Sequence, residues 1–352
     1  MQFYGSTRFL YPAKLGVLEA RFGAVRETWA RLIAANGDLF KILMLRRVIG
    51  EGLEVKNSIC AFEFAPGTWQ VQHLVSADRH EYSGTLASVI GIIDWIENTA
   101  SARCIRLSYR PDNPGTARLF DAVARSLPLR ASLRTVSDYY VAKLGTTPDS
   151  ALPHSADRDI TVRGAEPGDQ TALRALYART HPALPEWLSV ADPPLHGLDA
   201  RYRTYGLHRS RQLLVALHHG QIAGTVACWF GSEGINFSFL ENTIEDLYID
   251  ESLPFSEQAR LVALLLQTAV HHYQTRKRTI AVGLLETRHR TLIQTSGILP
   301  APEKQYALLT VGRTENGFGT SRNIIEGHYS ELLRSQASAE GIGDERLHHE
   351  GP

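Results

Sequence analysis

The sequence lacks the marks of several protein classes. Its three cysteines, Cys60, Cys104 and Cys228, are far apart and odd in number, which argues against a disulfide scaffold and predicts buried free thiols in a reducing compartment. Lysine plus arginine and aspartate plus glutamate both total 37, so the formal charge is zero and a nucleic-acid partner is disfavoured. No run of 18 apolar residues occurs, and the first ten residues, MQFYGSTRFL, do not resemble a signal peptide. We therefore expect a cytoplasmic protein with no membrane partner.

Metal-ligand spacings are also missing. Two adjacent histidine pairs occur, His218–His219 and His271–His272. Neighbouring side chains on a strand or a helix point to different faces, so neither pair is arranged to hold one ion. We expect no metal site.

The composition that remains is typical of a globular protein of two domains. The chain has 352 residues, of which 43% are hydrophobic and 21% charged. Residues 146–158 are rich in Pro, Ser, Thr and Asp without apolar periodicity, which predicts a linker. We therefore expect an N-terminal domain over residues 1–145 and a C-terminal domain over 159–315. For the polar tail, 316–352, we expect a short helix followed by disorder.

The two halves repeat one order of elements. In the first half, periodicity predicts strands at 40–49, 58–65, 67–76, 104–110 and 135–144 and helices at 84–99 and 113–127; in the second half, it predicts strands at 159–165, 211–219, 220–230, 243–250, 279–285 and 305–313 and helices at 166–181, 256–274 and 287–297. The intervals agree, because Val75 to Ile105 spans 30 residues and Ile249 to Ile280 spans 31. Side-chain identity between the halves is poor, so two unrelated α/β halves remain the alternative.

This order of elements resembles the GNAT superfamily of N-acyltransferases. The segment IEDLYID (244–250) is similar to the strand that leads into the family's cofactor turn. TRHRTLIQTSGI (287–298) is similar to its later helix, and NPGTARLF (113–120) to its Asn-x-x-Ala-x-x-Leu-Tyr element. The resemblance covers about residues 158–315 and, less completely, 40–145. It implies an α+β (α/β) fold of two GNAT-like domains, each a mixed, mostly antiparallel sheet flanked by helices.

The resemblance implies an acyl-CoA donor held between two splayed central strands. Its pyrophosphate would lie on a glycine-containing turn at the next helix N-terminus, where backbone N–H groups favour an anion. In the C-terminal half this turn contains no glycine between Asp250 and Gly283, and Glu257 stands where the family has a cation. A carboxylate there stabilises the helix but repels a pyrophosphate.

The corresponding turn of the N-terminal half is richer in donors. We expect acetyl-CoA or another acyl-CoA to bind there, through Arg79, Ser83, Gly84 and Thr85 together with Asn113 of the following helix. The alternative is that Ser83 and Gly84 only begin a helix.

Acyl transfer to an amine needs a base, and the strand of residues 243–250 offers Glu245 and Asp246. Strand alternation sends one of them inward and predicts that Tyr248 points the same way as Asp246. Burial would raise the pKa of an inward carboxyl group, as a base requires. His73 takes the comparable place in the N-terminal half, with a buried core histidine as the alternative.

Two further features concern the acid and the acceptor. The family's usual acid, a tyrosine on the later helix, is replaced by Phe120 and Ile293. Residues 180–211 are long and irregular for this fold, and such insertions often form binding pockets. Candidates to hold an anionic or aromatic acceptor are Trp187, Arg201, Tyr202, Arg203 and Tyr205.

These features favour an N-acyltransferase that moves an acyl group from acyl-CoA, or from the phosphopantetheine of an acyl carrier protein, to a small amine. Two alternatives remain open. The first is a catalytically silent scaffold that binds acyl-CoA or a partner. The second is an aminoacyl-tRNA-dependent aminoacyltransferase, for which a continuous basic groove would be the sign.

Overall fold

The computed structural model describes residues 4, 7, 18–19, 21–49, 52–77, 82–144, 159–180 and 196–347. The strands are β1 (Phe40–Ile49), β2 (Gly52–Ala65), β3 (Thr68–Ser76), β4 (Cys104–Tyr109), β5 (Ser132–Lys143), β6 (Ile160–Gly164), β7 (Arg209–His218), β8 (Gln221–Gly231), β9 (Thr243–Ile249), β10 (Ile280–Glu286) and β11 (Lys304–Gly312). The helices are α3 (Phe22–Ala34), α4 (Tyr82–Glu97), α5 (Pro114–Ser126), α6 (Gln170–Thr180), α7 (His196–Thr204), α8 (Phe255–Thr275), α9 (Arg290–Ser296) and α10 (Gly317–Leu347). In this part of the chain, no helix combines the length and the hydropathy needed to cross a bilayer.

The described strands form one sheet with 11 strands, in the order β1-β2-β3-β4-β11-β5-β10-β9-β8-β7-β6. The two halves therefore meet in the middle of the sheet, and each half gives its last strand to the other. β11 pairs with β4, β5 pairs with β10, and β11 and β5 pair with each other, all antiparallel. The sequence led us to expect a separate sheet in each domain. The exchange of the last strands joins the two sheets and leaves no edge where they meet.

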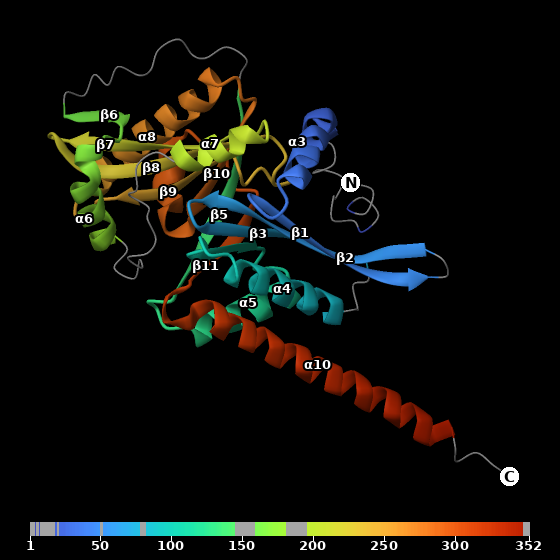
Figure 1. Cartoon of the computed structure of the whole chain (residues 1–352). Coiled ribbons are helices and arrows are strands. Elements are labelled where there is room, and N and C mark those ends of the chain that lie inside the picture. Colours follow the sequence, from blue (N-terminus) through green and yellow to red (C-terminus); the bar gives the residue numbers. More distant parts are fainter. Residues whose placement is uncertain are drawn as a thin grey trace.

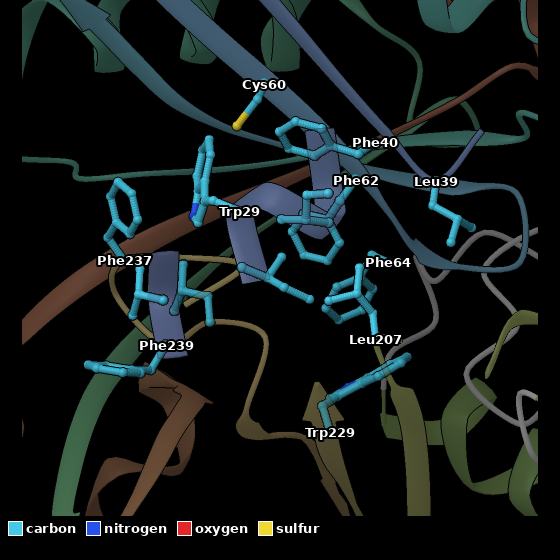
Figure 2. Close-up of a cluster of buried hydrophobic side chains, with 14 of the residues drawn as sticks. Trp29, Leu39, Phe40, Cys60, Phe62, Phe64, Leu207, Trp229, Phe237 and Phe239 are labelled. Carbon is cyan, nitrogen blue, oxygen red and sulfur yellow. The ribbon is translucent and has the colours of Figure 1, made fainter. Parts of the chain in front are cut away.

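The sheet is strongly curved around an inner core. Arg106 of β4 forms an ion pair with Glu245 of β9, although three strands separate them in the sheet. Four strand spacings would place these strands about 19 Å apart in a flat sheet, so the sheet must bend for the two side chains to meet. The inner core includes Trp29, Phe62 and Trp229 and draws residues from both halves (Figure 2).

Helices cover both faces of the sheet (Figure 1). On the outer face, α4, α5 and α10 bury their apolar sides against the N-terminal half, and α8 and α9 cover the C-terminal half. On the inner face, α3, α6 and α7 contribute buried residues. The α+β class and the layout of each half are confirmed by this arrangement.

Local sequence signals account for the helices that position the site. Asn113 caps α5 by accepting a hydrogen bond from Thr116 N (3.5 Å), and Pro114 is the first helical residue, as the sequence predicts. Helix α8 buries a stripe at helical spacing, formed by Ala259, Leu261, Val262, Leu265, Leu266, Ala269 and Tyr273. This stripe fixes α8 against β8 and β9, so its N-terminus lies beside the end of β9.

Some elements differ from the expectation. The tail forms α10, a helix of 31 residues, where a short helix was predicted, because Phe318 and Ile325 pack into the outer core against α4 and α5. Helices α3 and α7 were not predicted at all. The expected linker, residues 146–158, lies outside the described residues.

Candidate active site

In each half, a parallel pair of central strands separates. β9 and β10 are paired only at Thr243–Val282 and Ile244–Gly283, although both strands continue beyond these residues. β3 and β4 are paired from Thr68 to Val71 and then part in the same way. The expected splay is therefore present twice. In the C-terminal half, the β9–β10 ladder ends at Ile244, and β9 continues over residues 245–249.

A bulge lies at the splay of each half. His73 in β3 and Asp246 in β9 both have positive φ, 55° and 56°. The register of each strand with its antiparallel neighbour shifts at the same place. Non-glycine residues seldom adopt this backbone conformation, so its occurrence at equivalent positions indicates that the two halves share the same bulged strand. His73 and Asp246 are 173 residues apart, close to the 174 residues that separate the equivalent strand ends Val75 and Ile249.

The bulge changes which side chains share a face. Glu245 pairs with Ala227 and Tyr248 pairs with Thr225, and these two β8 residues lie two apart on one face. Glu245 and Tyr248 therefore share the inner face, whereas strand alternation predicts Tyr248 beside Asp246. That prediction was wrong because the bulge inserts one extra residue between them.

Asp246 is the carboxyl group with the clearest chemical signature. It is half-buried at the bulge. Burial, and next the carboxylate of Glu245, raise the pKa of Asp246 to about 7, while the guanidinium groups of Arg106 and Arg211 lower it in part. Such a group exchanges a proton near neutral pH, which a base in acyl transfer must do.

Glu245, in contrast, forms an ion pair with Arg106. Its two carboxylate oxygens accept hydrogen bonds from Arg106 Nη1 (3.2 Å) and Nη2 (2.5 Å). Glu245 is 2% exposed, so this pair is shielded from water. Arg106 comes from β4 of the other half, and no local pattern in the sequence pointed to it. Of the two carboxyl groups expected on this strand, Asp246 is the one that forms no ion pair with another described residue.

Two tyrosines complete the inner face of this site. Tyr248 is buried, and burial together with the charge of Asp246 raises the pKa of Tyr248 well above its usual range. The ring of Tyr177 from α6 meets it edge-on, with 4.6 Å between centroids. Glu286, at the end of β10, also acts electrostatically on Asp246 and Tyr248. Neither Tyr177 nor Glu286 was expected at the site from the sequence. The expected strand, 279–285, ends one residue before Glu286, and side-chain alternation continued by one residue would have placed Glu286 on this face.

The fold is identified by two splayed parallel pairs of strands, a matching bulge in each pair, and the helix that connects the two strands of each pair. The chain has the GNAT fold in tandem. Solved structures similar to it include a GCN5-related N-acetyltransferase from Sphaerobacter thermophilus, with 18% identity, a TM-score of 0.41 and coverage of 74% of this chain and 77% of that chain. A tandem GNAT protein from the clavulanic acid biosynthesis pathway has 10% identity, a TM-score of 0.41 and coverage of 81% and 87%.

A GCN5-related N-acetyltransferase from Kribbella flavida has 12% identity, a TM-score of 0.40 and coverage of 82% and 93%. No protein-family model and no curated protein matches the chain. Similarity at this level concerns the fold and says nothing about donor or acceptor.

The turn between β9 and α8 differs from the glycine-containing GNAT turn. Asp250 accepts hydrogen bonds from Ser252 N (3.1 Å) and Oγ (2.7 Å), and Gln258 Nε2 donates to the carbonyl of Leu253 (2.7 Å). Glu257 lies in the first turn of α8, with Oε2 3.3 Å from Nε2 of His218. The carboxylates around this helix N-terminus make it a poor place for a pyrophosphate.

The equivalent splay of the N-terminal half is filled by the chain itself. Residues 232–242, between β8 and β9, are largely buried against β3. Gln72 Nε2 donates to the carbonyl of Ile235 (2.7 Å), and Phe237 N donates to His73 Nε2 (3.1 Å). His73 Nδ1 lies 3.5 Å from Sγ of Cys60. Both ring nitrogens of His73 therefore have protein partners, and its ring stacks on Phe237 at 4.3 Å.

The residues expected to bind the donor in the N-terminal half are only partly placed. Arg79 lies outside the described residues, and Ser83 is half-buried at the start of α4. Thr85 Oγ1 accepts a hydrogen bond from Asn57 Nδ2 of β2 (3.3 Å). Asn113 caps α5. Gly84 and Thr85 thus join α4 to β2.

Gly84 allows this close approach, and its replacement by alanine is expected to destabilise the protein. A Cβ at position 84 would lie 2.3 Å from Oδ1 of Asn57, whose side chain is buried. We expect Gly84→Ala to lower the free energy of unfolding by about 1–3 kcal/mol in denaturant titrations. Gly91→Ala on the same helix is the control, because its Cβ would meet only a methyl of Leu43 at 3.2 Å. Equal stability of the two variants would contradict this account.

The expected acceptor residues contact the N-terminal half. Arg201 pairs with Asp38 and Glu63 (both 2.6 Å), and Tyr202 Oη donates to the Glu63 carbonyl (2.8 Å). Tyr205 Oη donates to Asp38 (3.2 Å), while Arg203 pairs with Asp199. Trp187 lies outside the described residues. Arg201, Tyr202 and Tyr205 thus hold α7 against the ends of β1 and β2, whereas Arg203 pairs within α7.

Proposed function

We propose that the protein is an N-acyltransferase whose reaction takes place in the C-terminal half, at the splay of β9 and β10. The observation that carries this proposal is Asp246, a half-buried carboxyl group at the β9 bulge with a pKa of about 7. Its counterpart in the N-terminal half, His73, is enclosed by Cys60 and Phe237. The sequence favoured the N-terminal half for the donor, and this comparison of the two bulges favours the C-terminal half.

The reaction follows from these positions. Asp246 accepts a proton from the acceptor amine, whose nitrogen attacks the carbonyl carbon of the thioester. The carbon–sulfur bond breaks, and the leaving thiolate takes up a proton to give a free thiol and an amide. The proton taken up by Asp246 can pass to the thiolate, because a thiol ordinarily has a pKa above about 7. Tyr248 lies on the same face as Glu245, and its raised pKa keeps it protonated, so it can donate a hydrogen bond to the leaving sulfur. Arg106 holds Glu245, so that Asp246 remains the proton acceptor.

The donor is an acyl thioester with a pantetheine arm. β9 continues over residues 245–249 beyond its last pair with β10, and this stretch can receive the amides of this arm as an added strand. Two donors fit this description: acyl-CoA and the phosphopantetheine of an acyl carrier protein. The second is considered because the N-terminus of α8 is acidic, and a carrier protein places one phosphodiester there, whereas CoA places a pyrophosphate. The acceptor is a small amine.

Hydrogen–deuterium exchange with acetyl-CoA, and separately with an acetylated carrier protein, would test where the donor binds. We expect slower exchange of the amides in residues 245–249 and in the first turn of α8. Residues 72–76 of β3 serve as the internal control, because residues 232–242 already cover that splay. Protection confined to β3 and α4 would move the donor to the N-terminal half. No protection with either donor would contradict the proposed function.

A further inference from the structure

Arg209 is a buried cation with an unused hydrogen-bond donor. It begins β7 and is fully buried, at 0% exposure. Its Nε donates to the carbonyl of Phe64 (2.9 Å) and its Nη1 to the carbonyl of Glu241 (2.7 Å). Its Nη2 has no acceptor among the described residues. Buried guanidinium nitrogens are normally satisfied, so this one indicates a group that the described residues do not supply.

The charge of Arg209 also has no direct ion pair within the described part of the chain. Burial lowers its pKa to about 10, which still leaves it cationic at neutral pH. Glu245 and Glu241 act on it only through longer-range electrostatics. The Glu245 carboxylate is taken by Arg106, and that of Glu241 accepts the backbone N–H groups of Gly234 and Asn236. A buried cation without a paired anion is costly for a fold to keep.

The aromatic ring beside the same guanidinium carries a second unused donor. Trp229 is 2% exposed, and its indole Nε1 also has no acceptor among the described residues. The Cζ atom of Arg209 lies 4.6 Å from the Trp229 ring and 4.1 Å from the Phe64 ring. Phe64 of β2 and Trp229 of β8 contact each other within the inner core, with 4.2 Å between centroids (Figure 2).

This cluster borders the site of the reaction. Arg106 lies over the other aromatic neighbour, with Cζ 4.2 Å from the Phe64 ring, and Arg211 lies 5.3 Å from the Trp229 ring. The same two arginines lower the pKa of Asp246. The rings of Phe64 and Trp229 therefore connect Arg209 to the two arginines that act on the proposed base, on the inner face of the sheet.

From this arrangement we infer a carboxylate-binding site formed by Arg209 Nη2 and Trp229 Nε1. The inference rests on the proposed function and names its substrate class: the acceptor is an amine that also carries a carboxylate group. A planar, singly charged carboxylate suits two donors beside aromatic rings, whereas a phosphate would leave most of its oxygens without partners. Its amino group then lies toward Asp246.

The test uses the indole N–H signals of the ¹⁵N-labelled full chain in NMR spectra. β-Alanine is titrated against propylamine, which has a similar length and no carboxylate. We expect β-alanine, and not propylamine, to shift the Trp229 indole signal, which is assigned by its loss in Trp229→Phe. Trp69→Phe is the matched control, because Trp69 Nε1 is also buried and without an acceptor in the described residues, but it belongs to the outer core.

Affinity gives a second readout. Trp229→Phe keeps an aromatic ring but loses the indole donor, and we expect it to weaken β-alanine binding about tenfold or more, with Trp69→Phe unchanged. In acyl-transfer assays, KM for β-alanine should rise by a similar factor while kcat stays the same. Equal shifts with both amines, or no shift with either, would overturn the inference. Because the NMR titration needs no donor, it is independent of whether acyl transfer itself is observed.

Discussion

Replacement of Asp246 by asparagine is expected to lower kcat by about 10²–10⁴-fold, because the amide cannot accept a proton from the acceptor amine. Donor binding should be retained, since the side chain keeps its size and the edge of β9 is unchanged. In the wild-type protein, kcat/KM should rise with pH through an apparent pKa near 7, the pKa of Asp246. The residual activity of Asp246→Asn should lack this rise. Steady-state assays over pH 5–9 measure both effects.

His73→Asn is the matched control for this prediction, because His73 occupies the equivalent bulge in the other half. It should lower stability through the lost contacts with Phe237 and Cys60 and leave kcat per folded molecule unchanged. A large loss of kcat in His73→Asn together with normal kcat in Asp246→Asn would place the reaction in the N-terminal half.

The same Asp246 variant should be more stable than the wild-type protein at pH 8. A carboxyl group whose pKa is raised on folding binds its proton more tightly in the folded state. Stability therefore falls as pH rises from the ordinary pKa of aspartate to about 7, and the cost persists above that pH. Asparagine removes this cost, so we expect a gain of about 1–3 kcal/mol at pH 8 that disappears near pH 4. Urea titrations at both pH values would show it.

Much of the fold could be predicted from the sequence because its signals are local. The apolar stripe of α8, the Asn113 cap of α5 and the largely apolar strand β1 each lie within one segment. The repeat of the two halves followed from the intervals between elements. The exchange of β5 and β11 could not be predicted, because two strands of similar apolar pattern fit either neighbour equally well and only the assembled sheet decides between them.

The site was predicted less completely, for physical reasons. Glu245, Asp246 and Tyr248 were correctly placed on the strand at the splay, but the bulge shifts the face of Tyr248, and a bulge depends on the register with β8. Arg106 belongs to the other half and reaches Glu245 only because the sheet curves. The charge on Asp246 therefore depends on residues far from it in the sequence, and no single-segment pattern could show that.

The largest expected loss of stability comes from breaking the pair between Arg106 and Glu245. Glu245 is 2% exposed, and the side chain of Arg106 is 12% exposed. Arg106→Met leaves a buried carboxylate without its cation, and we expect this to lower the free energy of unfolding by about 3–5 kcal/mol. Glu245→Met should cost a similar amount. The double variant should regain most of the loss, because it leaves no unpaired buried charge, and a double-mutant cycle in urea measures the coupling.

This cycle also tests whether the N-terminal half tunes the base of the C-terminal half. Arg106 lowers the pKa of Asp246, so its removal should raise that pKa and move the rise of kcat/KM to higher pH. Glu245 raises the pKa of Asp246, so its removal should move the rise to lower pH. In the double variant the two effects oppose each other, and the profile should lie between those of the single variants. Identical pH profiles in all four proteins would show that Arg106 only holds the halves together, and the site would then belong to the C-terminal half alone.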